Sequence, residues 1–411
     1  MKIHLHRAYI IILLICLTGF FGLYRFLPLS KQLYSVDLIY IYILFFSIIF
    51  IAIDIKKILS KNKAYTYKKK FNRAFIIFVL FISAEVLMSN FNYQQGLVNV
   101  LKEAMYYYVF SIVGFLILTI NYETINIEWF YKRITQISIA CSIVAIIIFA
   151  SYTYLGIDLI GIAGGQIRNG TVRFGIGSNL VIISIVISIT RILNERPRCL
   201  DICNLIVGFI QILFINKTRA VILYLMILTC VMCLRMKKVN NLIKFFMWVG
   251  ILISIIFLIF GNQIFMGKIN SFISNDYGML ARMDAIKFYM NEFYGKPLCG
   301  MGFISSKKTI AGWELIYGND GVYYRGDVGF VGLLNGFGVV GLCWAFAFLS
   351  KLFNSVEGKS TYSLAVKHIV LYFCISSASL CFMDAERLMC CIIPLIMMIL
   401  IKIRRVDGDG D

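Results

Sequence analysis

Long, uninterrupted runs of apolar residues alternate with short polar segments along most of the chain. A bilayer core is crossed by about 20 residues of α-helix, and about twelve runs approach or exceed this length. They lie at residues 8–27, 36–55, 74–92, 104–121, 134–155, 176–193, 200–216, 219–234, 242–264, 328–350, 367–384 and 388–403. Hydrocarbon contains no water to satisfy backbone amides, so each run is expected to be helical even where Ile, Phe and Tyr dominate. The pattern predicts an all-α, polytopic integral membrane protein.

Composition supports this prediction and limits the number of domains. Of the 411 residues, 60% are hydrophobic and 15% are charged, whereas a soluble protein has about 25% charged residues. The polar segments are too short for a separate soluble domain, so residues 1–411 are interpreted as one transmembrane domain. The first run follows Lys2 and Arg7 as a signal peptide would. It offers no small-x-small cleavage site, so an uncleaved first helix is expected.

The basic residues predict the orientation of the chain. With a cytoplasmic N-terminus and twelve spans, the inner segments hold 25 of the 40 Lys and Arg residues and 9 of the 21 acidic residues. The net charge of +19 then divides into +16 inside and +3 outside. Positive charge marks the cytoplasmic side, so both termini are expected to be cytoplasmic.

The same distribution argues against two other classes of protein. Lys and Arg lie in short stretches between apolar runs rather than along one soluble face, so nucleic acid is not an expected partner. Most of the 12 cysteines lie inside apolar runs, where a cysteine behaves as a small hydrophobe. The Cys230-x-x-Cys233 pair has no second pair or His cluster beside it, and no metal site or disulfide framework is expected.

Two connections are longer than simple turns. Residues 265–327 form an outward loop with Trp313 and many Tyr and Phe residues, and a helix is predicted at 281–293. Long loops are usually functional or disordered, and this one is expected to fold over the outer mouth. The second segment, 156–175, is glycine-rich and carries Arg168 and Arg173.

Three short motifs offer chemistry, each with a simpler structural alternative. Lys217-Thr218-Arg219-Ala220 is either a solvated hairpin with snorkelling side chains or an anion site at a helix start. In the long loop, Arg282 either pairs with an acid such as Asp284 or binds phosphate through its guanidinium. Gly300 and Gly302 allow a tight turn or a close approach of backbone to a ligand.

The carboxylates are equally ambiguous. Asp327, in Arg325-Gly326-Asp327-Val328-Gly329, is either an N-cap or a carboxylate that orients or deprotonates an acceptor hydroxyl. Glu85 and Asp384 lie near the outer ends of their spans. Buried charges in lipid suggest function, but an interfacial position explains these two residues at least as well.

Taken in order, these motifs resemble the bacterial O-antigen polymerase and ligase superfamily. The matching features are Lys217-Thr218-Arg219-Ala220, Arg282 followed by Pro297 and Gly300-x-Gly302, and Gly326-Asp327-Val328-Gly329-Phe330 followed by Gly338-Val-Val-Gly341. About twelve helices and a large loop late in the chain are also typical of this superfamily. The ligases have a His near the position of Asp327, and the outer loop of this chain contains none, which favours the polymerase branch.

The resemblance implies a GT-C-like bundle in the bacterial inner membrane that polymerises undecaprenyl-pyrophosphate-linked repeat units into O-antigen, capsule or exopolysaccharide. The implied reaction is an inverting, metal-independent glycosyl transfer without a cofactor. Arg219 and Arg282 would stabilise the leaving group, and Asp327 would act at the acceptor. Substrate contacts would come from Arg168, Arg173, Lys217, Gly300, Gly302 and Arg325. Membrane lipids, a chain-length regulator and a flippase are the other expected partners.

Two alternatives stay open from the sequence alone. A lipid-linked oligosaccharide flippase or transporter also has about twelve helices, but it needs a polar central path and usually has short loops. An O-antigen ligase is the second alternative.

Overall fold

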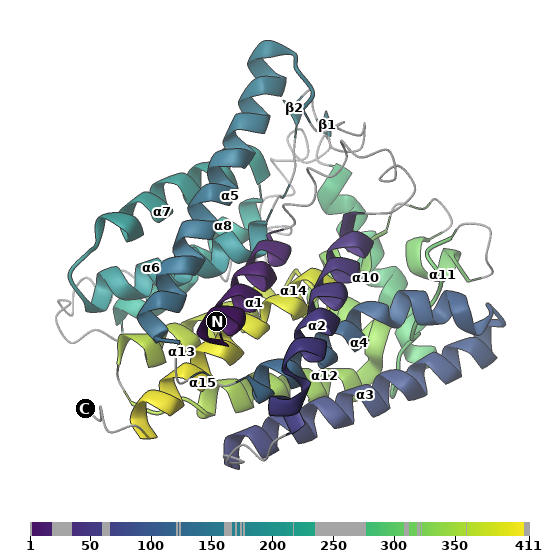
Figure 1. Ribbon diagram of the computed structural model, residues 1–411. Coiled ribbons are helices and arrows are strands. Elements are labelled where there is room, and N and C mark those ends of the chain that lie inside the picture. The colour runs from purple at the N-terminus through teal and green to yellow at the C-terminus, as the bar shows by residue number, and fades with distance from the viewer. Residues whose placement is uncertain are drawn as a thin grey trace.

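The computed structural model describes residues 2–18, 35–59, 66–120, 122, 125–159, 167–168, 171–172, 175, 177–216, 218–234, 277–307, 312–318, 321, 323–358 and 360–406. These residues are almost entirely helical (Figure 1). The first half contains α1 (Lys2–Leu17), α2 (Ser35–Leu59), α3 (Thr66–Tyr93), α4 (Leu97–Thr119), α5 (Ile127–Leu155), the two-residue strands β1 (Ile167–Arg168) and β2 (Thr171–Val172), and α6 (Ser178–Asn194). Next come α7 (Cys199–Ile210), the π-helix η4 (Gln211–Asn216), α8 (Arg219–Leu234) and α10 (Tyr277–Gly295). The chain continues with α11 (Glu314–Tyr317), the 3₁₀ helix η5 (Arg325–Val328), α12 (Gly329–Asn354), α13 (Thr361–Ser376), α14 (Ala385–Cys390) and α15 (Ile392–Val406).

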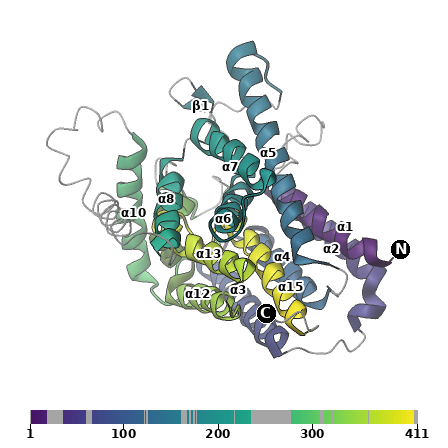
Figure 2. The same ribbon diagram turned by 90° about the vertical axis from the view of Figure 1, so that its left-hand side faces the viewer.

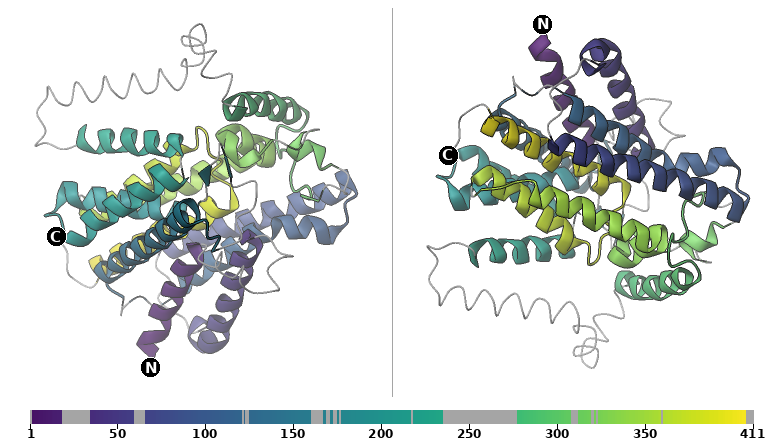
Figure 3. Two further views of the ribbon diagram at one scale, coloured as in Figure 1. Left: turned by 90° about the horizontal axis from the view of Figure 1, so that it is seen from above. Right: turned by 90° about the horizontal axis from the view of Figure 1, so that it is seen from below.

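The last helices form the centre of the bundle. α15 packs against α13, α12, α4 and α5, and all residues from Arg387 to Ile401 are buried. A helix that is apolar on all sides is stable only when other helices surround it. Figure 2 shows α13 and α15 near the middle of the bundle, with α1 and α2 at one side and α10 at the other. The purple N-terminal pair also lies at one edge in both views of Figure 3.

The outer helices expose large apolar side chains to their surroundings. Exposed examples are Phe45 on α2, Leu80 and Phe91 on α3, Phe214 on η4 and Phe346 on α12. Phe91 is 76% exposed. Soluble monomers rarely expose contiguous apolar patches of this kind, whereas lipid is the natural environment for them. The protein is therefore membrane-embedded.

Five helices are long and apolar enough to cross a membrane. They comprise residues Lys69–Tyr93, Leu97–Thr119, Ile127–Leu155, Cys199–Asn216 and Arg325–Asn354, and five shorter apolar helices accompany them. The predicted runs at 200–216 and 219–234 agree closely with α7–η4 and α8. The run at 242–264 lies outside the described residues, as does part of the 265–327 loop. Within that loop, the helix predicted at 281–293 is present as α10.

Several predicted boundaries were wrong. α3 begins at Thr66 rather than near residue 74, and α5 begins at Ile127 rather than near residue 134. α4 begins at Leu97 rather than near residue 104, because its first turns are amphipathic rather than apolar, and only residues 94–96 separate it from α3. The run predicted at 367–384 is helical only as far as Ser376, where α13 ends. The residues after Ser376 form turns in which Ser377 and residues 381–383 are buried, and apolar composition alone does not distinguish such turns from helix.

Candidate functional site

A break in α12 creates the docking place for the long loop. Gly338 has φ 62° and ψ −165° inside the helix, so the hydrogen bonds that normally run four residues back are interrupted there. Loop residues 297–302 replace them with backbone bonds. These bonds join Met301 N to Asn335 O (2.7 Å), Gly302 N to Gly336 O (3.0 Å), Val339 N to Pro297 O (3.0 Å) and Val340 N to Leu298 O (3.1 Å). The loop therefore satisfies the backbone groups that the break exposes.

Glycine is required at both sides of this contact. A Cβ at Gly338 would overlap the carbonyl oxygen of Leu298. A Cβ at Gly300 would lie 2.6 Å from the carbonyl oxygen of Asn335, and Gly300 also has a positive φ of 73°. The two glycines let two backbones approach more closely than any side chain allows.

Beyond the break, the loop backbone is held by polar side chains of α3 and α4 and of the turn between them. Ser89 Oγ accepts from Phe303 N at 2.9 Å, and Gln95 Oε1 accepts from Ser305 N at 2.8 Å. Farther along, Glu103 Oε1 accepts both the amide (2.9 Å) and the hydroxyl (2.8 Å) of Ser306. A non-helical segment at membrane depth needs partners of this kind, because lipid offers none.

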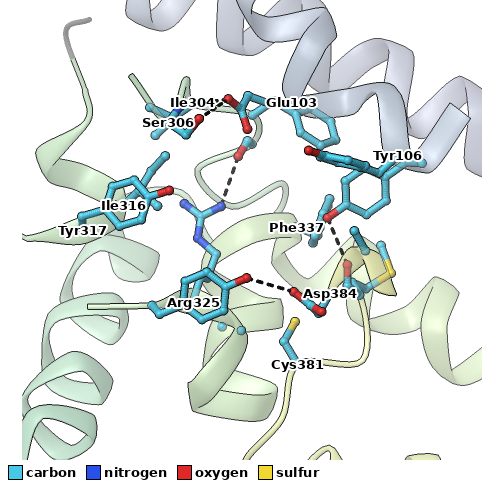
Figure 4. A pocket seen from close by; sticks show the side chains of 18 of the residues that line it. Glu103, Tyr106, Ile304, Ser306, Ile316, Tyr317, Arg325, Phe337, Cys381 and Asp384 are labelled. Carbon is cyan, nitrogen blue, oxygen red and sulfur yellow. Dashed lines mark hydrogen bonds between the residues drawn. The ribbon is translucent and has the colours of Figure 1, made fainter. Parts of the chain in front are cut away.

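A cavity of about 750 Å³ lies between this loop, α4, α11, the start of α12 and the turn before α14 (Figure 4). Its aromatic lining comes from Tyr106, Tyr107, Phe303, Trp313, Tyr317, Tyr324 and Phe337. The charged residues in its wall are Lys102, Glu103, Arg325, Asp384 and Glu386. Ligand sites typically have this size and this mixture of apolar walls with a few polar groups.

Arg325 is a cation in the wall that leaves part of its hydrogen-bonding capacity unused. Its Nη1 donates to the carbonyl oxygen of Gly302 at 3.3 Å. Its Nε and Nη2 are buried and have no hydrogen-bond partner among the residues that the structure describes. Gly336 makes room for the guanidinium, since a Cβ there would lie 3.3 Å from Nη1. A buried cation without an acid beside it is costly, and it favours an anion in the cavity.

The turn between α13 and α14 supplies the acidic wall. Asp384 accepts a long hydrogen bond of 3.5 Å from the hydroxyl of Tyr324. The turn is fixed by Cys381 N, which donates to Gly326 O at 2.9 Å, and by Tyr107, whose hydroxyl donates to Met383 O at 3.0 Å. Burial in this wall raises the pKa of Asp384. Within the described part of the chain, Arg325 and Asp384 form no ion pair with each other.

Of the substrate-binding and catalytic residues expected from the family resemblance, Gly302 and Arg325 line this cavity, and so does Asp384, which the sequence singled out as an acid near the end of a span. Gly300 lies at the break in α12 instead. Asp327 is part of η5, beside the cavity but not among its lining residues. Arg282 is exposed on α10, and the cavity lining does not include it.

The remaining candidates are described only in part or not at all. Arg219 is the first residue of α8 and Arg168 is in β1, but the described structure does not include their side chains. Lys217 and Arg173 lie outside the described residues.

Sequence reasoning did not single out Glu103, Tyr324 or the Tyr106–Tyr107 pair for this wall. A carboxylate and consecutive tyrosines in the first turns of a transmembrane helix are a weak signal that could have drawn attention to α4. Among the described residues, no group of three or more His, Cys, Asp or Glu side chains is arranged to hold a metal ion.

A second polar cluster, which joins α5, α6, α7 and α13, has paired charges instead. Arg198 donates to both carboxylate oxygens of Glu128, at 2.9 and 3.3 Å. Arg191 Nη1 lies 3.5 Å from Asp201 Oδ1. These arginines already have acidic partners, so the cluster is better suited to holding helices together than to binding an anion.

Comparison with protein-family models and with curated proteins finds no match to this chain. The class of the protein therefore rests on its own structure. It is a helical, membrane-embedded protein with an aromatic-lined, charged cavity inside the bundle.

Proposed function

We propose that the chain polymerises lipid-linked oligosaccharide repeat units on the outer side of the bacterial inner membrane. The donor is a growing glycan on undecaprenyl pyrophosphate, and the acceptor is a sugar hydroxyl of a second lipid-linked unit. One observation carries the proposal: Arg325 lines a cavity large enough for sugar rings, and its buried Nε and Nη2 have no hydrogen-bond partner among the described residues.

The chemistry of the reaction explains why that cation matters. When the anomeric C–O bond breaks, negative charge develops on the departing pyrophosphate. A fixed guanidinium stabilises this charge without reorganising, and it binds phosphate oxygens in a bidentate manner. In this proposal the protein supplies the positive charge from Arg325 and needs no metal ion or cofactor.

The other walls suit a glycan. Trp313, Tyr317 and Tyr106 offer flat apolar faces on which sugar rings can stack, and Lys102 and Glu386 add polar groups at the wall. A mixture of aromatic surfaces and a few polar groups provides contact area together with orientation.

The position of the cavity is consistent with a reaction outside the cytoplasm. Its walls come from the part of α4 that follows the α3–α4 turn, from the 265–327 loop and from the α13–α14 turn. The distribution of basic residues along the sequence assigns all three segments to the outer side. We extend the proposal to the whole topology: about twelve spans, both termini in the cytoplasm, a GT-C-like bundle, and a flippase and chain-length regulator as partners.

Glycan profiling of a strain that lacks the chain tests this function against its rivals. The proposal predicts surface glycans of one repeat unit, and chain length restored by the wild-type chain but not by Arg325→Ala. Accumulation of lipid-linked units on the cytoplasmic side would instead indicate a flippase. Long polymers left on their lipid carrier would indicate a ligase.

A further inference from the structure

Three carboxylates line the cavity, and their surroundings separate their roles. Glu103 accepts two hydrogen bonds from Ser306 and so holds the loop. Glu386 is exposed to the surroundings. Asp384 lies between these extremes: it is partly buried, and the Tyr324 hydroxyl approaches its carboxylate only to 3.5 Å. Asp384 is thus the lining carboxylate that neither holds the loop nor is exposed.

Asp384 and Arg325 both line the cavity, and they come from different parts of the chain. They approach the cavity from separate segments, η5 for Arg325 and the α13–α14 turn for Asp384 (Figure 4). Because they form no ion pair within the described structure, neither neutralises the other. In an inverting displacement, the base and the group that stabilises the leaving group act on opposite sides of the anomeric carbon. In the proposed reaction, Asp384 and Arg325 would take these two roles.

Gly326 in η5 leaves room for the carboxylate of Asp384. A Cβ at Gly326 would lie 3.2 Å from Asp384 Oδ1, so a larger residue at position 326 would crowd the carboxylate. Asp327, the base suggested by the sequence, follows Gly326 directly but does not line the cavity.

We propose that Asp384 is the general base that activates the acceptor hydroxyl, an inference that rests on the function proposed above. The acceptor oxygen attacks the anomeric carbon and forms the new glycosidic C–O bond. The bond from that carbon to the pyrophosphate oxygen breaks, and its electron pair leaves with the lipid pyrophosphate beside Arg325. The hydroxyl proton passes to the Asp384 carboxylate and then to solvent.

The electrostatic surroundings support this role. Burial raises the pKa of Asp384, Arg387 opposes the rise and Asp327 adds to it. A raised pKa makes a carboxylate a stronger base as long as it is ionised at the working pH. The other titratable groups that interact with it are Tyr40, Tyr107, Tyr324, Cys381 and Glu386.

The test uses purified full-length protein in vesicles, with lipid-linked repeat units isolated from a strain that lacks the chain. Initial rates of chain lengthening are measured against pH for the wild type, Asp384→Asn and Asp327→Asn. Glu314→Gln serves as the matched control, since Glu314 is an exposed carboxylate on α11 outside the cavity lining.

We expect Asp384→Asn to lower kcat by about 10²- to 10⁴-fold, the usual contribution of general base catalysis, with little change in KM. The rate of the wild type should fall at acid pH. The residual activity of Asp384→Asn should not show this fall, whereas Asp327→Asn and Glu314→Gln should show it. If Asp384→Asn does not accumulate in membranes, Asp384→Glu is measured instead. This variant should have a reduced kcat and should keep the fall in rate at acid pH, called the acid limb of the pH profile.

A kcat for Asp384→Asn close to that of the wild type, or an unchanged acid limb, would overturn the assignment. So would loss of the acid limb in Asp327→Asn, which would identify Asp327 as the base. A wild-type protein that lengthens no chains would instead defeat the proposed function itself, so the two failures are distinguishable.

Discussion

Replacement of Arg325 by Met should separate function from stability. Its Nε and Nη2 have no hydrogen-bond partner in the described part of the chain, and Nη1 makes one 3.3 Å bond to Gly302 O. A hydrogen bond to a charged group contributes about 1.5–3 kcal/mol. Two such bonds to a pyrophosphate would amount to about 3–6 kcal/mol, and about 1.4 kcal/mol corresponds to a tenfold change in rate. We therefore expect kcat/KM to fall by about 10²- to 10⁴-fold.

Stability should change in a different way. Arg325→Met loses the bond to Gly302, a cost of about 1.5–3 kcal/mol, but removes two buried nitrogens whose lack of partners costs about 1–3 kcal/mol each. The variant should consequently unfold at the same temperature as the wild type or at a higher one. Arg325→Lys keeps the charge and loses the bidentate geometry, so its activity should be intermediate.

The assay combines chain lengthening in vesicles with thermal unfolding in detergent. Lys287→Met is the matched control, because Lys287 is an exposed cation on α10, and it should behave as the wild type. Normal lengthening by Arg325→Met would refute the argument. A large fall in its unfolding temperature would also do so, since it would show that Arg325 has a structural role.

Two further variants test the loop and the glycan-binding wall. Gly338→Ala places a Cβ against the Leu298 carbonyl at a positive φ, and we expect it to lose about 1–3 kcal/mol of stability. Its unfolding temperature should therefore be lower than that of the control Gly295→Ala, whose Cβ would meet no atom within 4 Å. Equal unfolding temperatures of the two variants would show that the loop is not docked at the break. Trp313→Ala removes an aromatic face of the cavity. One lost ring contact corresponds to about 1 kcal/mol, so the KM for lipid-linked units should rise about fivefold to tenfold while kcat stays nearly unchanged. A fall in kcat alone would contradict a stacking role.

The helices could be predicted from the sequence because lipid imposes a simple rule on them. Long apolar runs bounded by charges indicated α3, α5, α7–η4, α8 and α12 to within a few residues at most of their ends. The rule fails where an apolar run forms turns inside the protein, as between Ser376 and Ala385. There, backbone groups pair with groups far away in the sequence, such as the hydroxyl of Tyr107, which donates to the carbonyl oxygen of Met383.

The candidate site was only partly predictable, for a related reason. Gly302 and Arg325 were found because they belong to motifs in one continuous stretch of chain. Glu103 on α4 and Asp384 in the turn before α14 lie more than 50 residues from the loop in sequence, so the sequence could single out Asp384 as an acid but could not place either residue beside the loop. Arg282 illustrates the converse case, because a charged residue at the right spacing on α10 is exposed rather than directed into the cavity.

The most direct test of the central claim is to count lipid pyrophosphate molecules released for each glycosidic bond formed by the purified protein in vesicles. The account predicts a ratio of one in the wild type and the loss of both products in Arg325→Ala. Bond formation without release of lipid pyrophosphate, or release at the wild-type rate in Arg325→Ala, would contradict it.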